Sequence, residues 1–445
     1  MTSSAGSNRR FILLFSQVHT DFRLAELRGI TCALSLEGNV DKQIDAQRHV
    51  FVVSAPSEEV IKQFLARSML LKSAYEYLED AESHEELQRR VRETAKSYER
   101  FNTPTQSFAV RVRPIGRKRG VETLEKAKAM AYALELEKAP IQLDTPLNTF
   151  TVIEQYEHEK SEHPGRVYFG RLIGDGQYGL KTRYSLPSRL YIGNTTMDPE
   201  LAFIQANICA VRSGDLAIDP FCGTGGLLIS AAHFGAYVIG LEINYQIARG
   251  IGKSSRAGVD VRGDEESVRG NFVQYGMEER FVALLNADAS RHEMWRQGQL
   301  ADAIVADPPY GLREKSRKIG KKERKEHWTE PIRTDHAVHF PEKARYALGS
   351  VFVDLLQLAA TRLRIGGRVA FWFPVIREQY GADVLPRHDA LNLVENCEQP
   401  LTLKTSRRLL TYEKTREAAP HERAWVARDQ YEAATFRDVL LPNNV

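Results

Sequence analysis

Four consecutive residues, Asp307-Pro308-Pro309-Tyr310, follow an apolar run at 303–306 that is long enough for a buried strand. Proline has no N–H group and a fixed φ, so two in a row end the strand in a stiff loop. The loop brings together a carboxylate, the carbonyl oxygen of Pro308 and the ring of Tyr310. These groups suit a planar base with an exocyclic amine, because the ring stacks on the base and the acceptors take the amine hydrogens. We treat these four residues as candidate catalytic residues; the alternative is a strand-ending turn without chemistry.

A glycine-rich loop at 219–226, reading DPFCGTGG, lies between a predicted strand and a predicted helix. Its glycines allow a tight turn close to a ligand, and the helix behind it offers free N–H groups. The glycine pattern is not the full dinucleotide fingerprint, and a carboxylate at the strand end would repel phosphate. The loop therefore predicts a site for an amine-bearing or cationic ligand, with the candidate residues Asp219, Pro220, Phe221, Gly223, Thr224 and Gly225.

Two more acids follow the next strands along the chain. Glu242 is placed to accept hydrogen bonds from ribose hydroxyls, and Asp288 to accept one from an adenine amine. A ligand with adenine, ribose and a charged amino acid but no phosphate fits these acids and the loop at 219–226, which predicts S-adenosyl-L-methionine as the cofactor. The alternative is a structural glycine turn with scattered acids.

The elements that must position these residues alternate between strand and helix. Strands are predicted at 216–218, 237–241, 281–285, 303–306 and 368–373, and helices at 198–211, 227–234 and 351–363. This alternation predicts an α/β fold with a doubly wound parallel sheet, which binds its ligand at the carboxyl ends of the strands.

The front half of the chain predicts a separate RNA-binding part. We divide the chain into an α/β domain at 1–65, a second domain at 66–173, a linker at 174–194 and the doubly wound domain at 195–445. Residues 89–119 carry a net charge of +8, although the whole protein carries only +3. Because arginine forks match phosphates, this segment favours nucleic acid over a solvated helix face and surface loop. The candidate contacts are Arg111, Arg113, Arg117, Lys118 and Arg119.

A second basic run, at 313–325, follows the candidate catalytic loop with a net charge of +6. We interpret it as a loop that meets phosphates near the target base, and a solvated linker is the alternative. Arg313 in this run and Arg407 near the last strand pair are further candidate RNA contacts.

Composition bounds the class of protein. With 445 residues, 42% hydrophobic and 27% charged, the chain predicts a soluble protein of two or three domains. No apolar run is long enough for a membrane span, and the N-terminus lacks a signal-type apolar region, so we expect a cytoplasmic protein without a membrane partner. The four cysteines form no CxxC pair, which argues against a disulfide framework and a zinc site.

At this point the sequence resembles a known family. Besides DPFCGTGG, the stretches YIGNTTMDPELA at 191–202, AHFGA at 232–236, DPPYGLR at 307–313 and RRLLTYEK at 407–414 are similar to the catalytic subunit of eukaryotic and archaeal tRNA (guanine-10-N2)-methyltransferases. Cys222 stands where many relatives have Val, and Glu242 where Asp is frequent.

The resemblance implies transfer of a methyl group from S-adenosylmethionine to the exocyclic N2 amine of guanosine 10 in tRNA. It implies a Rossmann-like methyltransferase domain with a late antiparallel strand, behind an N-terminal α/β domain and a THUMP-type RNA-binding domain. It also implies a heterodimer with a small zinc-binding activator protein, for which we consider an apolar edge near the strand at 369–373.

Other functions stay open at this point. The same loop could act on adenine N6 in RNA or DNA or on a glutamine side chain, although the basic front segment disfavours a protein substrate. A non-catalytic RNA-binding protein is disfavoured by the intact acids Asp219, Glu242, Asp288 and Asp307. A nicotinamide-dependent dehydrogenase is disfavoured by Asp219 and the incomplete glycine pattern.

Overall fold

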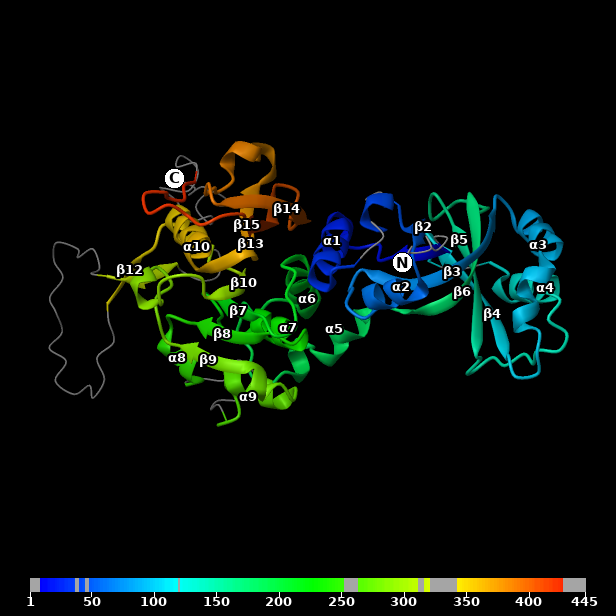
Figure 1. Ribbon diagram of the computed structural model, residues 1–445, viewed down its shortest axis with the longest axis horizontal. Helices are drawn as coiled ribbons and strands as arrows, with labels where there is room; N and C mark the ends of the chain where they lie inside the picture. The colour runs from blue at the N-terminus through cyan, green and yellow to red at the C-terminus, as the bar shows by residue number, and fades with distance from the viewer. Residues whose placement is uncertain are drawn as a thin grey trace, which may run out of the picture. The chain divides into compact units, whose positions relative to one another are not determined.

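The computed structural model describes residues 9–36, 40–44, 48–118, 121–251, 263–310, 316–320 and 342–426. The chain divides into two compact units, Met1–Tyr178 and Gly179–Val445, whose elements are labelled in Figure 1. None of the helices in the described ranges combines the length and apolarity that crossing a membrane requires.

The first unit is built on one six-stranded sheet with the order β2-β1-β3-β6-β5-β4. Its strands are β1 (Arg9–Phe15), β2 (Val50–Ala55), β3 (Leu71–Ala81), β4 (Phe108–Ile115), β5 (Asn148–Gln155) and β6 (Arg166–Asp175). Its longer helices are α1 (Arg23–Leu34), α2 (Glu58–Leu65), α3 (His84–Glu93) and α4 (Thr123–Ala133). The sheet joins strands from both sides of the boundary predicted at residue 65, and the division of this unit into two domains stays a prediction.

The helix α3 is short and charged. It ends at Glu93, and a 3-10 turn follows over Ala95–Phe101. Thr94 helps to end it, because its hydroxyl donates back to the Arg90 carbonyl oxygen over 2.9 Å. The linker predicted at 174–194 is folded at both ends: β6 runs to Asp175, and Tyr191 is fully buried in the second unit.

The second unit holds a seven-stranded sheet with the order β14-β15-β13-β10-β7-β8-β9. Five adjacent strands of this sheet run parallel to one another. They are β7 (Leu216–Asp219), β8 (Tyr237–Leu241), β9 (Phe281–Leu285), β10 (Ala301–Ala306) and β13 (Leu363–Ile376). The strands β14 (Leu391–Pro400) and β15 (Thr405–Lys414) are antiparallel additions. The doubly wound fold with a late antiparallel strand is confirmed, and the strand order reverses between β7 and β10, where such folds bind ligands.

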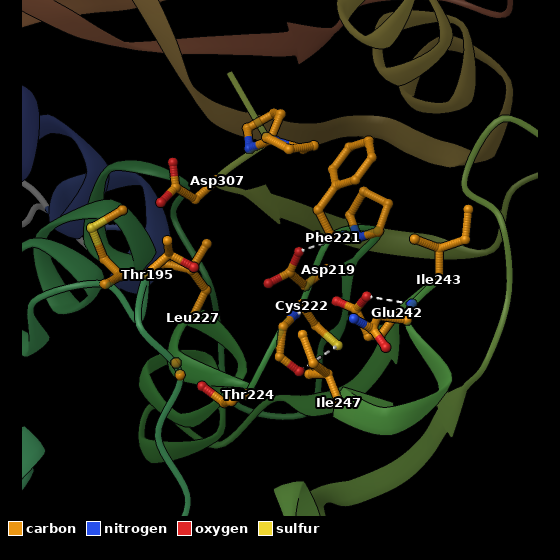
Figure 2. Close-up of a pocket in the computed structure, with 18 of the residues that line it drawn as sticks. Thr195, Asp219, Phe221, Cys222, Thr224, Leu227, Glu242, Ile243, Ile247 and Asp307 are labelled. Carbon is orange, nitrogen blue, oxygen red and sulfur yellow. Dashed lines mark hydrogen bonds between the residues drawn. The ribbon is translucent and has the colours of Figure 1, made fainter. Parts of the chain in front are cut away.

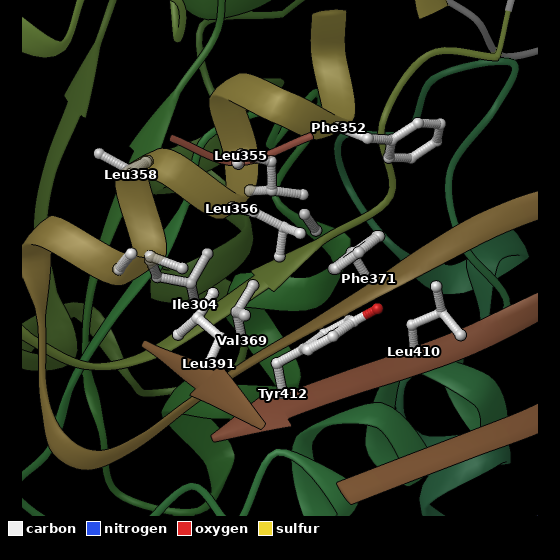
Figure 3. Packing of buried hydrophobic residues seen from close by; sticks show 14 of the residues in the cluster. Ile304, Phe352, Leu355, Leu356, Leu358, Val369, Phe371, Leu391, Leu410 and Tyr412 are labelled. Carbon is white, nitrogen blue, oxygen red and sulfur yellow. The ribbon is translucent and has the colours of Figure 1, made fainter. Parts of the chain in front are cut away.

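One face of this sheet packs against α10 (Leu348–Arg362), which lies across the strands in Figure 3. Apolar side chains that alternate along β10, β13 and β15 point toward this helix, as expected for strands with a period of two. The core that they form includes Ile304, Phe352, Leu355, Leu356, Val369, Phe371, Leu410 and Tyr412.

The other face packs against α6 (Pro199–Ile208) and α7 (Gly226–His233), and its centre is a buried polar bridge. The Gln205 side chain on α6 donates to the carbonyl oxygens of Ala306, over 3.2 Å, and Ala370, over 2.8 Å. It accepts from the indole N–H of Trp372 over 2.8 Å. The bridge therefore fixes the end of β10 immediately before Asp307.

The prediction that residues near 369–373 form a sheet edge for a partner is wrong. Those residues belong to β13, which pairs with β10 on one side and with β15 on the other, and Val369 and Phe373 are fully buried. Among the described strands, the edges of this sheet are β14 and β9.

Replacing Gln205 by leucine tests the bridge. We expect Gln205→Leu to lower the free energy of unfolding by about 1–3 kcal/mol, because the Trp372 N–H and two carbonyl groups lose a buried partner. Urea denaturation measures the change, with Gln379→Leu on the exposed surface of the same unit as the matched control. Equal stability of the two variants would contradict the bridge.

Candidate active site

A cavity of about 1070 Å³ lies within the second unit at the carboxyl ends of β7, β8 and β10. Figure 2 shows Asp219 and Glu242 reaching into it from neighbouring strand ends, with Asp307 on its far wall. The predicted residues that line it are Asp219, Pro220, Phe221, Gly223, Thr224, Glu242, Asp288, Asp307, Pro308, Pro309, Tyr310 and Arg407. The structure thus brings the predicted cofactor loop and catalytic loop into one site.

The glycine loop has the tight shape predicted for it. Gly223 and Gly225 have φ values of +51° and +83°, in the left-handed region that favours glycine. Gly225 does not line the cavity but caps α7, and a Cβ there would lie 2.9 Å from Val268 Cγ1. A side chain at residue 225 is therefore excluded by both conformation and packing.

Glu242 holds the loop as well as facing the cavity. Its Oε2 accepts the Gly223 N–H over 3.1 Å, and its Oε1 accepts the Asn244 N–H over 2.6 Å. The carboxylate thus ties the end of β8 to the loop after β7. Its contact with ribose stays a prediction.

Asp288 is 3% exposed, and both of its carboxylate oxygens accept hydrogen bonds. Oδ1 accepts from the N–H and hydroxyl of Ser290 over 2.9 and 2.8 Å. Oδ2 accepts from the Ile319 N–H over 2.6 Å. Ile319 ends β11 (Arg317–Ile319), which pairs with β12 (Lys343–Arg345), so Asp288 anchors this ribbon beside the cavity.

The candidate catalytic loop is held from both ends. The Tyr310 hydroxyl donates to Asp307 Oδ1, and the Ser316 hydroxyl donates to the Pro309 carbonyl oxygen over 2.5 Å. Desolvation, followed by the charge of Asp307, raises the pKa of the Tyr310 hydroxyl well above its ordinary value. Tyr310 therefore stays protonated and able to donate.

Arg407 lies in the cavity wall, beside the catalytic loop. Its Nη1 is 3.9 Å from Asp307 Oδ2, and its guanidinium carbon is 4.1 Å from the centre of the Trp372 ring. The side chain is 15% exposed, and its Nε donates to Gln399 Oε1 over 2.6 Å. The sequence predicted an RNA contact here, and that contact stays a prediction; the structure brings the residue next to Asp307.

Residues before α6 form a wall that the site predictions missed. Thr195, Thr196 and Met197 line the cavity, and the Thr196 hydroxyl lies 2.9 Å from that of Thr224 in the glycine loop. The signal was present, because the stretch 191–202 carried part of the family resemblance, but uncharged side chains gave it no obvious chemistry.

A second group was missed on the ribbon. Arg317, Lys343 and Tyr346 line the cavity, and Lys343 Nζ donates to the Ile243 carbonyl oxygen over 2.8 Å. Desolvation lowers the pKa of the Lys343 ammonium. Arg317 belongs to the basic run at 313–325, but no local pattern marks Lys343 and Tyr346, because β11 and β12 are joined only through long-range pairing.

The other predicted RNA contacts lie in the first unit, on β4 and the loop after it. Arg111 donates to the Leu143 carbonyl oxygen, and Arg113 Nη1 donates to the Ser73 hydroxyl over 2.9 Å. Arg117 donates to the Ser161 carbonyl oxygen over 3.1 Å, and Lys118 pairs with Glu159 at 3.5 Å. Predicted contacts at Arg119 and Arg313 lie outside the described residues.

Acids from outside the basic segment reduce its effective charge. Arg100 pairs with Glu76 at 2.7 Å, and Arg90 pairs with Glu86 at 2.5 Å. The count of +8 along 89–119 therefore overstates the positive potential that this segment presents.

No group of three or more His, Cys, Asp or Glu side chains in the described ranges is arranged to hold a metal ion. The acids of the cavity instead act on one another. Burial, supported by the charges of Asp307 and Glu242, raises the pKa of the Asp219 carboxyl well above its ordinary value. The Phe221 N–H, which donates to Asp219 Oδ1 over 2.9 Å, opposes that shift only in part.

Replacing Asp219 by asparagine tests whether the buried charge of the Asp219 carboxylate lowers the stability of the protein. Because the native carboxyl binds its proton more tightly than the unfolded one, the wild type loses stability as pH rises from about 4, the ordinary Asp pKa, through the native pKa. Asp219→Asn keeps the acceptor for Phe221 without the charge. We expect it to raise the free energy of unfolding by about 1 kcal/mol at neutral pH.

Urea denaturation at several pH values measures this effect, and the gain should shrink toward pH 4. Asp389→Asn, at an exposed position, is the matched control. An Asp219→Asn protein that is less stable than the wild type at neutral pH would show that the charge of Asp219 does not lower the free energy of unfolding.

Residues in both units match protein-family models. Residues 9–178 match the model of the Tmrp11 THUMP N-terminal domain, and residues 187–326 match that of the RMKL-like methyltransferase domain. The chain is also similar in fold to the crystal structure of TrmN from Thermus thermophilus, with 17% identity, a TM-score of 0.44 and coverage of 91% of this chain and 99% of that one.

Curated relatives match over nearly the whole chain. The tRNA (guanine(10)-N(2))-methyltransferase TRMT11 of Homo sapiens is 36% identical over 97% of this chain and 92% of its own length. The TRMT11 protein of Rattus norvegicus is 36% identical over 93% and 89%. The Saccharomyces cerevisiae tRNA (guanine(10)-N(2))-methyltransferase is 32% identical over 91% and 93%. The resemblance noted in the motifs is confirmed: the chain belongs to the tRNA (guanine(10)-N(2))-methyltransferase family.

Proposed function

We propose that this protein transfers a methyl group from S-adenosylmethionine to the N2 amine of guanosine 10 in tRNA. One observation carries the proposal: the cavity joins the Asp307–Tyr310 loop to acids at three neighbouring strand ends. The names of the relatives, which match over nearly their full lengths, supply the position of the nucleotide.

The donor set of the cavity fits this cofactor. Acceptors at the ends of β7, β8 and β9 suit a ligand rich in hydroxyl and amino groups, and they disfavour the phosphates of a dinucleotide. Glu242 would hold the ribose, Asp288 the adenine amine and Asp219 the cationic amino-acid part. When bound, S-adenosylmethionine supplies a methyl group on a positively charged sulfur. The cavity is large enough for a nucleoside-sized ligand together with a base.

The acceptors of the catalytic loop address the weakness of the nucleophile. The lone pair of a guanine amine is conjugated with the ring, so the nitrogen attacks poorly unless its hydrogens are held. The Asp307 carboxylate and the Pro308 carbonyl oxygen would accept both hydrogens and align the nitrogen with the methyl group at roughly 3–3.5 Å. After transfer, the proton leaves to Asp307 or to water.

Tyr310 would offset the cost of presenting the base. Removing a base from its stack costs a few kcal/mol, and stacking on an aromatic ring returns about 1–3 kcal/mol. The Tyr310 hydroxyl now donates to the same carboxylate that the amine would use. Entry of the base therefore exchanges one donor to Asp307 for another.

The first unit would anchor the tRNA. Support comes from the match to a THUMP N-terminal domain and from the basic side chains on and after β4. Of these, Arg111 and Lys118 are exposed, whereas Arg113 bonds within the sheet. The exposed pair is thus better suited to phosphate contact.

Two variants separate the roles of the two units. Arg111→Glu with Lys118→Glu should weaken tRNA binding and lower its salt slope by about two units, because each lost phosphate contact removes about one. Asp307→Ala should keep tRNA affinity and lose methyl transfer. Filter binding at several salt concentrations and single-turnover assays with labelled cofactor measure both.

Arg269→Glu, at an exposed arginine of the second unit, controls for charge alone. Normal tRNA binding by the double variant would contradict the RNA contact and favour the alternative, a basic segment that only faces solvent. A wild-type product with the label on adenine rather than guanosine N2 would favour the rival substrate.

We further propose that a small zinc-binding activator protein pairs with the β9 edge of the sheet. The strand Phe281–Leu285 reads FVALL, without the charges that usually protect an edge, and Val282 is 55% exposed. The opposite edge, β14, carries two glutamates and ends on a proline. An unprotected apolar edge suits a partner that adds a strand.

Co-expression tests this proposal. Val282→Arg should abolish co-purification of a zinc-binding partner and reduce solubility, whereas Leu403→Arg, at an exposed leucine in the turn between β14 and β15, should change neither. A wild-type protein that is monodisperse and fully active alone would contradict the need for a partner.

A further inference from the structure

Arg407 is held in one orientation by three neighbours from different elements. Its guanidinium stacks on Trp372 of β13, its Nε donates to Gln399 Oε1 of β14, and its Nη2 lies 3.5 Å from Met197 Sδ before α6. These contacts occupy one face and two of the nitrogens. The remaining Nη1 lies 3.9 Å from Asp307 Oδ2, and the guanidinium also interacts with the Tyr310 hydroxyl.

The support continues beneath the stack. The indole N–H of Trp372 donates to Gln205, and the same amide donates to the carbonyl oxygen of Ala306, next to Asp307 in the chain. The strand end that carries the carboxylate and the ring that carries the guanidinium are therefore fixed to one buried side chain. The distance between Arg407 and Asp307 is set by the core rather than by the surface.

The surroundings of Asp307 are otherwise acidic. Asp219, at the end of β7, lies close enough to Asp307 that the charge of Asp307 raises the pKa of the Asp219 carboxyl. The Tyr310 hydroxyl donates to Asp307 from the same loop. Two carboxylates in one partly desolvated pocket resist ionising together. A fixed cation beside one of them allows that one to stay charged.

We infer that Arg407 is a positioning residue for methyl transfer, which keeps the Asp307 carboxylate ionised and oriented toward the substrate amine. The inference rests on the proposed function and adds to it an electrostatic partner for the acceptor. A protonated Asp307 would have a donor where the amine needs an acceptor. Arg407 contributes to the rate through Asp307 and not through affinity for tRNA.

The neighbouring residue supplies a matched control. Arg408 projects to the opposite face of the strand, where its Nη2 donates to the Asn396 carbonyl oxygen over 3.1 Å and its guanidinium stacks on Tyr380 at 4.3 Å. Neither partner lines the cavity. Arg408→Gln thus removes the same charge from the same strand without touching the site.

Single-turnover methylation of tRNA over a range of pH, together with Kd values for tRNA and for S-adenosylhomocysteine, tests the inference. Arg407→Gln should lower the rate at neutral pH by roughly 100-fold, because misplacement of a reacting group costs about that much. Both Kd values should be unchanged. The loss should shrink only in part as pH rises, because hydroxide restores the charge of Asp307 but not its orientation. Arg407→Lys should recover much of the rate.

Several results would overturn the inference. A higher Kd of Arg407→Gln for tRNA with a normal rate would make Arg407 an RNA contact. A rate loss of Arg407→Gln that is equal at every pH, or equal to that of Arg408→Gln, would contradict its electrostatic role. Thermal unfolding checks the fold, and Arg407→Lys with a rate as low as that of Arg407→Gln would also count against it. A wild-type protein that does not methylate guanosine would instead overturn the proposed function.

Discussion

The site depends on the crowding of carboxylates at one edge of a parallel sheet. Consecutive strands of the second unit end on or beside an acid, and the parallel arrangement brings those ends together. Burial and neighbouring charge raise the pKa of Asp219, so the arrangement costs stability that the rest of the unit must supply. The loops around the cavity reduce that cost with backbone donors, such as the Gly223 N–H on Glu242 and the Ile319 N–H on Asp288.

Hydrogen bonds between side chains and backbone also join segments that are distant in sequence. Glu242 links the ends of β7 and β8, Asp288 holds the ribbon formed by β11 and β12, and Gln205 fixes β10 and β13 to α6. Each link is a buried or half-buried hydrogen bond between a side chain and the backbone. The shape of the cavity is thereby determined before any ligand enters.

Local sequence was sufficient for the parallel part of the sheet in the second unit, whereas the late antiparallel strand was implied by the family resemblance. Short apolar runs that end on Asp219, Glu242 or Asp307, separated by helical segments, predict parallel strands with acids at a common edge, and the structure has that arrangement. Features that depend on long-range pairing were beyond it. The place of Arg407 beside Asp307 was not predicted, because nothing local shows that β15 lies against β13, which brings its guanidinium onto Trp372. Long-range pairing is also the reason why the sequence did not predict Lys343 in the site or the interior position of the strand around Phe373.

The hydrogen bond from Tyr310 to Asp307 has a consequence for how the loop meets its substrate. A carboxylate has about four acceptor positions on its two oxygens, and the phenol occupies one of them, on Oδ1. A planar amine that offers two hydrogens to the loop and a ring face to Tyr310 would replace this contact with its own. The loop therefore already holds the Asp307 carboxylate in a fixed orientation before an amine arrives.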